Sequence, residues 1–351
     1  MDTAAVIENL KNYDGPELKL MEVCGTHTAS IFKSGIRSMI SPAIKLISGP
    51  GCPVCVTPAA YIDKCAGYAM RKDHILLTFG DMMKVPGTDG SLSDLKGRGA
   101  SAELMYSPFE AVERAAAHPE TMFVVAAVGF ETTAPAYALA IEDAKVRGIK
   151  NLKFVTALKT VVPALSLICE NQPDIDGFIC PGHVSVIIGI RPYERLAAKY
   201  KKPFVIAGFE AEHILAVIYD IVRQIKKGEA RAKNLYGNAV RDQGNIKALD
   251  IIKKHFEEGP AMWRGLGIID RSGLYLKNEG SFDVGSRGLD EDIKLPGECR
   301  CKDVIVGRIN PDECPMFSKG CRPDAPWGPC MVSGEGACGI WYRNRKAGSV
   351  K

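Results

Sequence analysis

The chain has 351 residues, of which 46% are hydrophobic and 25% are charged, and its 45 basic residues nearly balance its 41 acidic residues. This composition is typical of a globular protein with room for two or three domains, and it excludes a disordered chain or a collagen-like fibre. The balanced charge, with no run of five like charges, gives no electrostatic footprint for nucleic-acid binding.

Membrane insertion and secretion are not expected either. The longest uncharged apolar stretch, Met122–Phe130, has nine residues, whereas a membrane-spanning helix needs about 20. The first fourteen residues carry Asp2, Glu8 and Asp14, where a signal peptide would have a basic start followed by an apolar run. We therefore expect the protein to lie in the cytoplasm.

Short apolar runs rich in β-branched residues predict strands throughout the first two thirds of the chain. They are Leu18–Val23, Ile44–Ile47, Ile75–Phe79, Met122–Val128, Phe154–Leu158, Gly177–Ile179 and Phe204–Ala207. Helical patterns lie between several of them, at Ser107–Ala117, Ala134–Val146 and Ala211–Ile225. Alternating strands and helices are typical of parallel βαβ units. The pattern predicts two successive Rossmann-like α/β domains with parallel sheets, at residues 1–118 and 119–233.

The composition changes after Lys233. A helical stretch at Ile246–Glu257 is followed by loop-rich sequence, and from Pro296 onward the chain is rich in Cys, Pro and Gly. Such a region buries too little apolar surface to fold alone and needs a staple such as a metal cluster. We therefore expect residues 234–351 to form a small Cys-rich C-terminal region that carries an iron–sulfur cluster.

Most of the predicted strands run directly into a loop motif. The motifs are CGTH (24–27), GPGCPVC (49–55), FGD (79–81), GFETT (129–133), PGHVS (181–185) and GFE (208–210). Ligands of open parallel sheets bind at the carboxyl ends of the strands, so these motifs predict one functional cleft between two domains. Ordinary turn punctuation explains the glycines and prolines, but it does not explain the cysteines and histidines beside them.

Six of the twelve cysteines lie within forty residues of the C-terminal region. They are Cys299, Cys301, Cys314, Cys321, Cys330 and Cys338. Four thiolates suit an iron–sulfur cluster or a zinc ion, but the C-x₂₋₄-C pairs that are usual in zinc ribbons are missing. Two thiols would remain spare, and a spare pair beside a cluster could cycle between dithiol and disulfide. Simple buried cysteines are the remaining interpretation.

A second sulfur-rich set lies near the N-terminus and consists of Cys24, His27, Cys52 and Cys55. The C-P-V-C sequence is similar to thioredoxin-like redox motifs, in which a helix N-terminus lowers the thiol pKa. Two such motifs at the ends of adjacent strands predict a soft-ligand pocket that holds iron temporarily. The alternative is that these cysteines are buried as small hydrophobic residues.

The remaining candidates carry weaker signals. His183 and Glu131 lie in motif loops, where they could exchange protons or be purely structural. Asp81 could equally be a helix cap. Cys65, Cys169 and Cys180 are expected to be structural.

The motifs taken together resemble those of the hydrogenase maturation family HypD. They cover nearly the whole chain, in the family's order. They are MEVCGTHTASIFKSGI, SGPGCPVCVTP, TFGDMMKVPGTDGSL, GFETTAPAYA, ICPGHVSVIIG, WRGLGIID and MVSGEGACGIWY.

This resemblance implies a cytoplasmic assembly scaffold rather than a conventional turnover enzyme. In the family, an Fe(CN)₂CO unit for [NiFe] hydrogenases is held together with the small chaperone HypC. Cyanide arrives from HypE, which makes it from a carbamoyl group supplied through HypF, and the hydrogenase large subunit is an indirect partner. The family fold has two α/β domains and a small C-terminal domain with a [4Fe–4S] cluster.

The resemblance also implies roles for individual residues. The family's essential CGxH motif falls on Cys24 and His27, which would hold the iron being assembled, and the GPGCPVC pair falls on Cys52 and Cys55. The cluster ligands map to Cys301, Cys314, Cys321 and Cys338, which leaves Cys299 and Cys330 as a candidate redox pair, similar to ferredoxin–thioredoxin reductase. Either cysteine of the C-x-C sequence could reach iron, so the two sets could be permuted.

Two other functions fit the same residues. An iron–sulfur-dependent thiol–disulfide oxidoreductase would turn over a disulfide substrate and bind no iron beyond its cluster. A structural zinc protein that serves only as a docking platform would hold one zinc ion.

Overall fold

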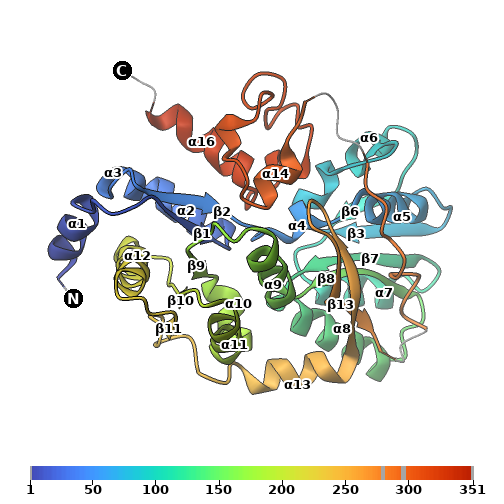
Figure 1. Cartoon of the computed structure of the whole chain (residues 1–351). Coiled ribbons are helices and arrows are strands. Elements are labelled where there is room, and N and C mark those ends of the chain that lie inside the picture. The colour runs from blue at the N-terminus through green and yellow to red at the C-terminus, as the bar shows by residue number, and fades with distance from the viewer. Residues whose placement is uncertain (1, 278–280, 294–297, 349–351) are drawn as a thin grey trace.

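Two sheets built mainly of parallel strands form the core of the computed structural model, which describes residues 2–277, 281–293 and 298–348 (Figure 1). A mixed α/β fold with a Cys-rich C-terminal region was expected from the sequence, and this expectation is confirmed. Each predicted strand falls on a strand of the structure, with ends that differ by at most two residues. None of the helices within the described residues is long and apolar enough to cross a membrane.

The first sheet has the strand order β11-β10-β9-β1-β2, and all of its neighbouring strands are parallel. Its strands are β1 (Leu18–Glu22), β2 (Ile44–Ser48), β9 (Gly177–Cys180), β10 (Phe204–Ile206) and β11 (Ala232–Asn234). One face is covered by α1 (Thr3–Lys11), α2 (Gly25–Lys33), α3 (Ile36–Met39) and α12 (Ala211–Lys226). The other face packs against α9 (Val161–Asn171), α10 (Gly182–Ile188), α11 (Arg191–Tyr200) and the C-terminal region.

The second sheet has the order β12-β13-β8-β7-β3-β6. Its strands are β3 (His74–Thr78), β6 (Ala102–Leu104), β7 (Met122–Gly129), β8 (Leu152–Lys159), β12 (Phe256–Trp263) and β13 (Gly267–Leu276). One face packs against α5 (Ala59–Ala69), η1 (Gly80–Lys84) and α6 (Leu92–Lys96), and the other against α7 (Pro108–Ala117), α8 (Ala134–Val146) and α13 (Ile246–His255). Two short strands, β4 (Pro86–Gly87) and β5 (Gly90–Ser91), form a separate hairpin.

The two sheets are interleaved along the chain, so the predicted division into successive units at 1–118 and 119–233 is wrong for the sheets. Strand β3, before residue 118, pairs with β7 after it, and β1 pairs with the distant β9. The chain passes from the first sheet to the second between β2 and β3, returns through α9, and crosses again through α13. Apolar runs identify buried strands, but they do not reveal which strands pair, because central strands of both sheets, such as β7, β9 and β10, are alike in being apolar and buried on both faces.

The hairpin β12–β13 was not predicted from the sequence. The helix expected at Ile246–Glu257 ends at His255, and the chain continues into β12. Gly259 and Pro260 interrupt the strand pattern there, and the register of the hairpin shifts between Gly259 and Ala261. Proline and glycine are tolerated in strands at such bulges, so the usual strand signal is lost.

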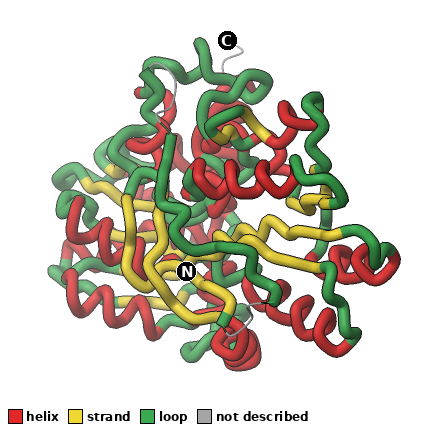
Figure 2. Tube along the Cα trace, turned by 90° about the vertical axis from the view of Figure 1, so that its right-hand side faces the viewer, coloured by secondary structure: helices red, strands yellow, loops and turns green. Residues whose placement is uncertain are grey.

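From residue 298 onward, the described part of the chain consists of four helical elements connected by loops. They are α14 (Cys301–Ile305), η2 (Pro311–Glu313), α15 (Pro329–Val332) and α16 (Ala337–Gly348). These elements lie across the first sheet and next to α4 (Pro53–Val56), as Figure 1 shows. Figure 2 shows the same end of the chain, near the label C, as short helices and loops. The Trp341 ring packs edge-on against Phe32 of α2, and the Arg37 guanidinium lies over both rings. The cysteines are therefore held against the carboxyl ends of β1 and β2.

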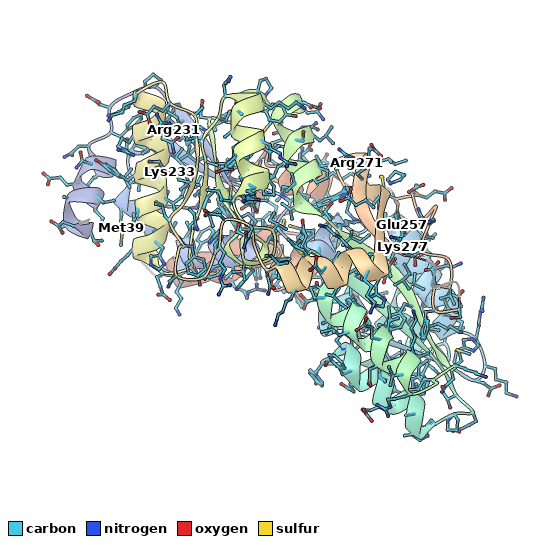
Figure 3. All side chains as sticks on the ribbon, turned by 90° about the horizontal axis from the view of Figure 1, so that it is seen from below. Met39, Arg231, Lys233, Glu257, Arg271 and Lys277 are labelled. Carbon is cyan, nitrogen blue, oxygen red and sulfur yellow. A yellow bond between two sulfur atoms is a disulfide. The ribbon has the colours of Figure 1, made fainter. Side chains whose placement is uncertain are left out.

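Charged side chains mark the outer edges of the two sheets. Figure 3 labels Arg231 and Lys233 at β11 and Glu257 at β12, which are the outermost strands of their sheets. Charges on edge strands oppose pairing with another chain.

Candidate functional site

Cys24 follows β1 directly and occupies the N-cap position of α2. Its side chain is almost entirely covered, since the residue is 8% exposed. Burial raises the pKa of the Cys24 thiol to about 11, and the N–H groups of His27 and Thr26 and the Thr26 hydroxyl only partly oppose this shift. Cys24 is therefore a neutral thiol near pH 7, and binding of a metal ion would displace its proton.

Cys52 and Cys55 lie where the chain passes from the first sheet to the second. Cys52 is the N-cap of α4, its sulfur accepts the Cys55 N–H at 3.2 Å, and Pro53 occupies the first turn. The two cysteines form a disulfide with their Cα atoms 5.3 Å apart, and both are buried. This is the helix N-terminal C-x-x-C geometry that the sequence predicted.

The His27 ring is fully buried and contacts the loop after β10. Its Nε2 atom lies 3.1 Å from the carbonyl oxygen of Gly208, and its ring packs against Phe209 with centroids 5.0 Å apart. Burial lowers the His27 pKa to about 4, so the ring is neutral at pH 7 and Nε2 carries the proton that Gly208 accepts. The Nδ1 atom is buried without a hydrogen-bond partner, which leaves a lone pair for a ligand.

All six C-terminal cysteines line one small cavity, together with Phe317, Gly328 and Met331. Backbone N–H groups point at three of the sulfurs: Arg300 N–H to Cys314 at 3.5 Å, Trp327 N–H to Cys321 at 3.4 Å, and Cys338 N–H to Cys330 at 3.3 Å. N–H groups aimed at sulfur stabilise thiolates and tune iron–sulfur centres.

Within this cavity, Cys330 contacts particular neighbours. The thiols of Cys301 and Cys338 are the largest influences on the pKa of the Cys330 thiol, whereas the pKa of Cys299 is raised by burial and by Cys301, Cys314 and Cys321. The sequence-based pairing of Cys299 with Cys330 stays a prediction, since both line this cavity, and the cysteine of the C-x-C sequence that influences the Cys330 pKa most is Cys301.

The cavity suits a cluster better than a single ion. No group of three or more His, Cys, Asp or Glu side chains in the described part of the chain is placed to hold a metal ion. A single zinc ion needs every ligand sulfur within about 2.3 Å of one point. An iron–sulfur cluster distributes its four cysteines over several iron atoms, which fits an apolar cavity with cysteines around its wall.

A second small cavity joins the two sulfur sites. Its wall includes Gly25, Cys52, Cys55, Cys330 and Glu335. The Cys55 sulfur lies 3.9 Å from the carbonyl oxygen of Pro329, the residue before Cys330. Cys330 thus faces the disulfide on one side and the other C-terminal cysteines on the opposite side.

Arg264, in the sequence WRGLG, connects these parts but was not identified as a site residue from the sequence. It is fully buried, and its guanidinium donates to the Thr57 carbonyl oxygen through Nε (3.2 Å) and Nη2 (3.0 Å). Its Nη1 lies 2.9 Å from Oδ1 of Asp292, and its positive charge acts to lower the pKa of Cys301. A lone arginine in an apolar motif was the signal available in the sequence.

Two buried carboxyl groups lie at the carboxyl ends of the sheets. Glu22 accepts hydrogen bonds from the hydroxyls of Thr28 (2.5 Å) and Ser48 (2.6 Å), and Glu131 accepts the Val161 N–H at 2.9 Å. Burial raises the pKa of each to about 7. Glu131 was a sequence candidate; Glu22 was missed, although a charge within the apolar run LMEVC was a signal. His183, the other candidate, packs against the Phe209 ring, which also contacts His27. The centroids of the His183 and Phe209 rings are 4.2 Å apart.

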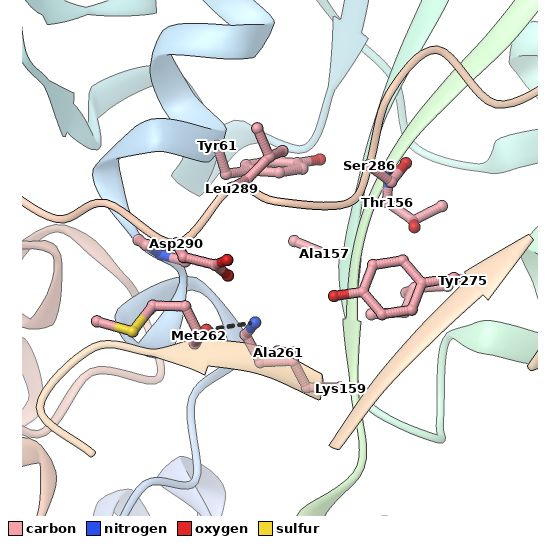
Figure 4. A pocket seen from close by; sticks show the side chains of 12 residues that line it. Tyr61, Thr156, Ala157, Lys159, Ala261, Met262, Tyr275, Ser286, Leu289 and Asp290 are labelled. Atoms are coloured by element: carbon pink, nitrogen blue, oxygen red, sulfur yellow. Dashed lines mark hydrogen bonds between the residues drawn. The ribbon is translucent and has the colours of Figure 1, made fainter. Parts of the chain in front are cut away.

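Another cavity lies beside β8 and the hairpin β12–β13, away from the cysteines (Figure 4). The Lys159 amine points into it, is 3% exposed, and donates to the Met262 carbonyl oxygen at 2.8 Å. Burial lowers the Lys159 pKa to about 7, against the influence of Asp290. No cysteine lines this cavity.

Comparisons with known proteins agree with these motifs. The family model HypD, described as "Hydrogenase formation hypA family", matches residues 2–345. The hydrogenase maturation factor HypD of Rhodobacter capsulatus is 42% identical over 333 residues, covering 92% of this chain and 88% of the relative. That of Escherichia coli is 39% identical over 335 residues (94% and 90%), and a putative hydrogenase expression/formation protein of Methanocaldococcus jannaschii is 38% identical over 336 residues (94% and 93%).

Proposed function

Because the chain belongs to the HypD family of hydrogenase formation proteins, we propose that it is the scaffold on which the Fe(CN)₂CO unit of a [NiFe] hydrogenase is assembled. The observation that carries this proposal is the continuous arrangement of sulfur. The Cys52–Cys55 disulfide and the six C-terminal cysteines line two small cavities that share Cys330, and Cys24 lies beside the first of them, next to Gly25 and Gly51.

In this proposal the iron being assembled is cargo, and Cys24 is its thiolate ligand. Soft thiolates suit the low-spin iron that cyanide and carbon monoxide favour. His27 offers the unpartnered Nδ1 atom on the first turn of the same helix. The low exposure of Cys24 keeps water away, and a water-excluded site strengthens every electrostatic interaction within it.

The cysteines of the C-terminal cavity divide into two roles. We assign Cys301 and Cys330 as the redox dithiol, because the thiol of each is the largest single influence on the pKa of the other. This assignment leaves Cys299, Cys314, Cys321 and Cys338 as ligands of a [4Fe–4S] cluster. It replaces the sequence-based choice of Cys301 as a ligand and Cys299 as a redox thiol, which the C-x-C spacing could not separate. A cluster held there would supply single electrons.

The dithiol can exchange with the neighbouring disulfide in a balanced reaction. The Cys330 thiolate attacks one sulfur of the Cys52–Cys55 bond, which forms a mixed disulfide and releases the other sulfur as a thiolate. The Cys301 thiolate then attacks Cys330. The products are a Cys301–Cys330 disulfide and the Cys52/Cys55 dithiol, so two electrons and two protons move toward the Cys24 side.

In this proposal, the partner proteins bind at the edge of the first sheet where Cys24 follows β1. HypC would bind close to Cys24 and share the iron, HypE would deliver cyanide there, and the hydrogenase large subunit would receive the finished unit. The cleft edge near Cys24 is favoured because a ligand supplied by a partner must reach the iron.

Iron and acid-labile sulfide counts in the anaerobically purified complex with HypC test the proposal. A cluster alone contains equal amounts of iron and sulfide, so a scaffold shows an excess of about one iron per chain. The Cys24→Ala variant should lose that excess and keep its sulfide, whereas Cys65→Ala, which removes a buried thiol of α5, should keep both. Equal iron and sulfide in the wild-type complex would contradict the proposal.

A second candidate is an iron–sulfur-dependent thiol–disulfide oxidoreductase. The contact between Cys55 and the backbone next to Cys330 favours it as strongly as it favours internal electron transfer. This function predicts steady turnover of a protein disulfide and no iron in excess of sulfide.

A further inference from the structure

The loop between Cys330 and Cys338 is packed tightly against Cys330. Gly336 lies so close to Cys330 that a Cβ atom built there would stand 2.2 Å from the Cys330 carbonyl oxygen. The Cys338 N–H donates to the Cys330 sulfur at 3.3 Å. The loop therefore cannot shift far at this end without moving the cysteines.

The middle of the same loop lies against Gly25, the residue that follows Cys24. A Cβ atom at Gly25 would stand 2.2 Å from the carbonyl oxygen and 2.8 Å from the Cα atom of Glu335. The contact is between two backbones, so no side-chain rotation can open it. Gly25 and Glu335 also share the wall of the cavity that holds Cys52 and Cys55. The outer side of the loop is free, because Gly334 and Glu335 are exposed.

One carboxylate of the second sheet holds the loop in this position. Oδ2 of Asp81, in η1 after β3, accepts the Ser333 hydroxyl at 2.8 Å and the Gly334 N–H at 2.9 Å. Ser333 is 1% exposed, so this hydrogen bond is shielded from water. The sequence alone allowed Asp81 to be a helix cap. In the structure, its described side-chain hydrogen bonds are made with Ser333 and Gly334 of the C-terminal loop instead.

We propose that Asp81 is a positioning residue that latches the loop Ser333–Glu335 over Cys24 and so controls which molecules reach this thiol. The inference rests on the proposed role of Cys24 as the iron ligand. Small diatomic ligands pass with the latch closed, whereas a partner's side chain reaches Cys24 only after the two hydrogen bonds at Asp81 break. The latch spans the two sheets, since Asp81 follows β3 and Cys24 follows β1.

Alkylation of Cys24 tests the latch without requiring any assembled iron. The full chain, with its cluster intact, is treated anaerobically with a bulky polymer-linked maleimide, and labelling at Cys24 is followed by mass spectrometry. Asp81→Ala removes the acceptor and should speed labelling at least tenfold. Asp81→Asn keeps one acceptor oxygen without the charge and should give an intermediate rate. Asp89→Asn, which changes an exposed carboxylate of the neighbouring hairpin, should label at the wild-type rate.

Ser333→Ala, which removes one of the two donors, is the second test if Asp81→Ala does not fold. Wild-type labelling rates in both Asp81→Ala and Ser333→Ala, with cluster absorbance and circular dichroism unchanged, would overturn the latch. Equal acceleration in Asp89→Asn would overturn it as well, because that result indicates general loosening. The labelling rate of Cys24 could rise from wild type through Asp81→Asn to Asp81→Ala in a protein that never carries the Fe(CN)₂CO unit. That result would support the latch and refute the scaffold function.

Discussion

Gly51 stands directly against Cys24: a Cβ atom at Gly51 would lie 2.5 Å from the backbone nitrogen and 2.6 Å from the Cα atom of Cys24. The loop that presents Cys52 and Cys55 is thus pressed against the loop that presents Cys24, with no space for a side chain between them. Such close approach of two backbones requires glycine.

Gly51→Ala should therefore destabilise the protein by about 1–3 kcal/mol, the usual cost of overpacking a dense site. It should also separate Cys24 from the disulfide and lower the amount of iron bound beyond the cluster. The matched control is Gly67→Ala in α5, where a Cβ atom meets nothing within 4 Å. This variant should gain about 0.5–1 kcal/mol, since alanine is preferred in helices. Urea unfolding measures both changes, and equal effects at the two glycines would contradict the account.

Single serine substitutions separate the cluster ligands from the redox dithiol. Cys330→Ser should keep the visible absorption of the cluster but lose electron transfer to Cys52–Cys55, because the attacking thiol is gone. Cys299→Ser and Cys314→Ser should lose the cluster. The measurement is iron and sulfide content with thiol counting after reduction. A cluster retained in Cys299→Ser and lost in Cys301→Ser would restore the sequence-based assignment of Cys301 as a ligand.

The buried ion pair of Arg264 and Asp292 predicts a large effect on stability. Arg264→Met leaves the Asp292 carboxylate buried, with Lys302 at 3.2 Å as its remaining charged partner among the described residues, and it removes both donors to Thr57. Loss of one partner of a buried pair costs about 3–5 kcal/mol. The double variant Arg264→Met/Asp292→Asn should recover part of this free energy of unfolding. A loss below about 1 kcal/mol for the single variant would show that the pair is not an important anchor.

The pKa of Lys159 predicts a pH dependence of stability. Burial lowers this pKa from its ordinary value of 10.5 to about 7, so between these values the unfolded chain binds more protons than the folded chain. The free energy of unfolding should therefore rise with pH from about 7 to about 10. Lys159→Met should lack this rise, so that the wild type gains stability relative to the variant across the window. The free energy of unfolding of both proteins is measured by urea unfolding between about pH 7 and 10. If it changes with pH by the same amount in both, Lys159 does not have the lowered pKa.

The strands could be predicted because buried parallel strands are short apolar runs. In addition, a loop motif that directly follows such a run marks the carboxyl end of the strand. The order of strands in the sheets could not be predicted. The pairing of β1 with β9 joins segments more than 150 residues apart, and nothing local in LKLME selects that partner. The hairpin β12–β13 was hidden by Gly259 and Pro260 at its bulge.

The candidate site was predictable where residue type alone carries the chemistry. The cysteines and His27 stand out by type and spacing, and the structure brings Cys24, Cys52 and Cys55 together. The contact of Cys330 with Cys301 depends on how an irregular loop folds, so the spacing could not reveal it. The same holds for Asp81, whose hydrogen-bond partners lie 252 and 253 residues further along the chain.

The most direct test of the scaffold function is an infrared spectrum of the protein purified anaerobically with HypC, recorded beside a Cys24→Ala variant whose cluster content has been checked. The account predicts cyanide and carbonyl stretching bands in the wild type and their absence in the variant. If neither sample shows these bands although cluster and HypC are present, the protein does not carry the Fe(CN)₂CO unit, and the thiol–disulfide oxidoreductase becomes the better explanation.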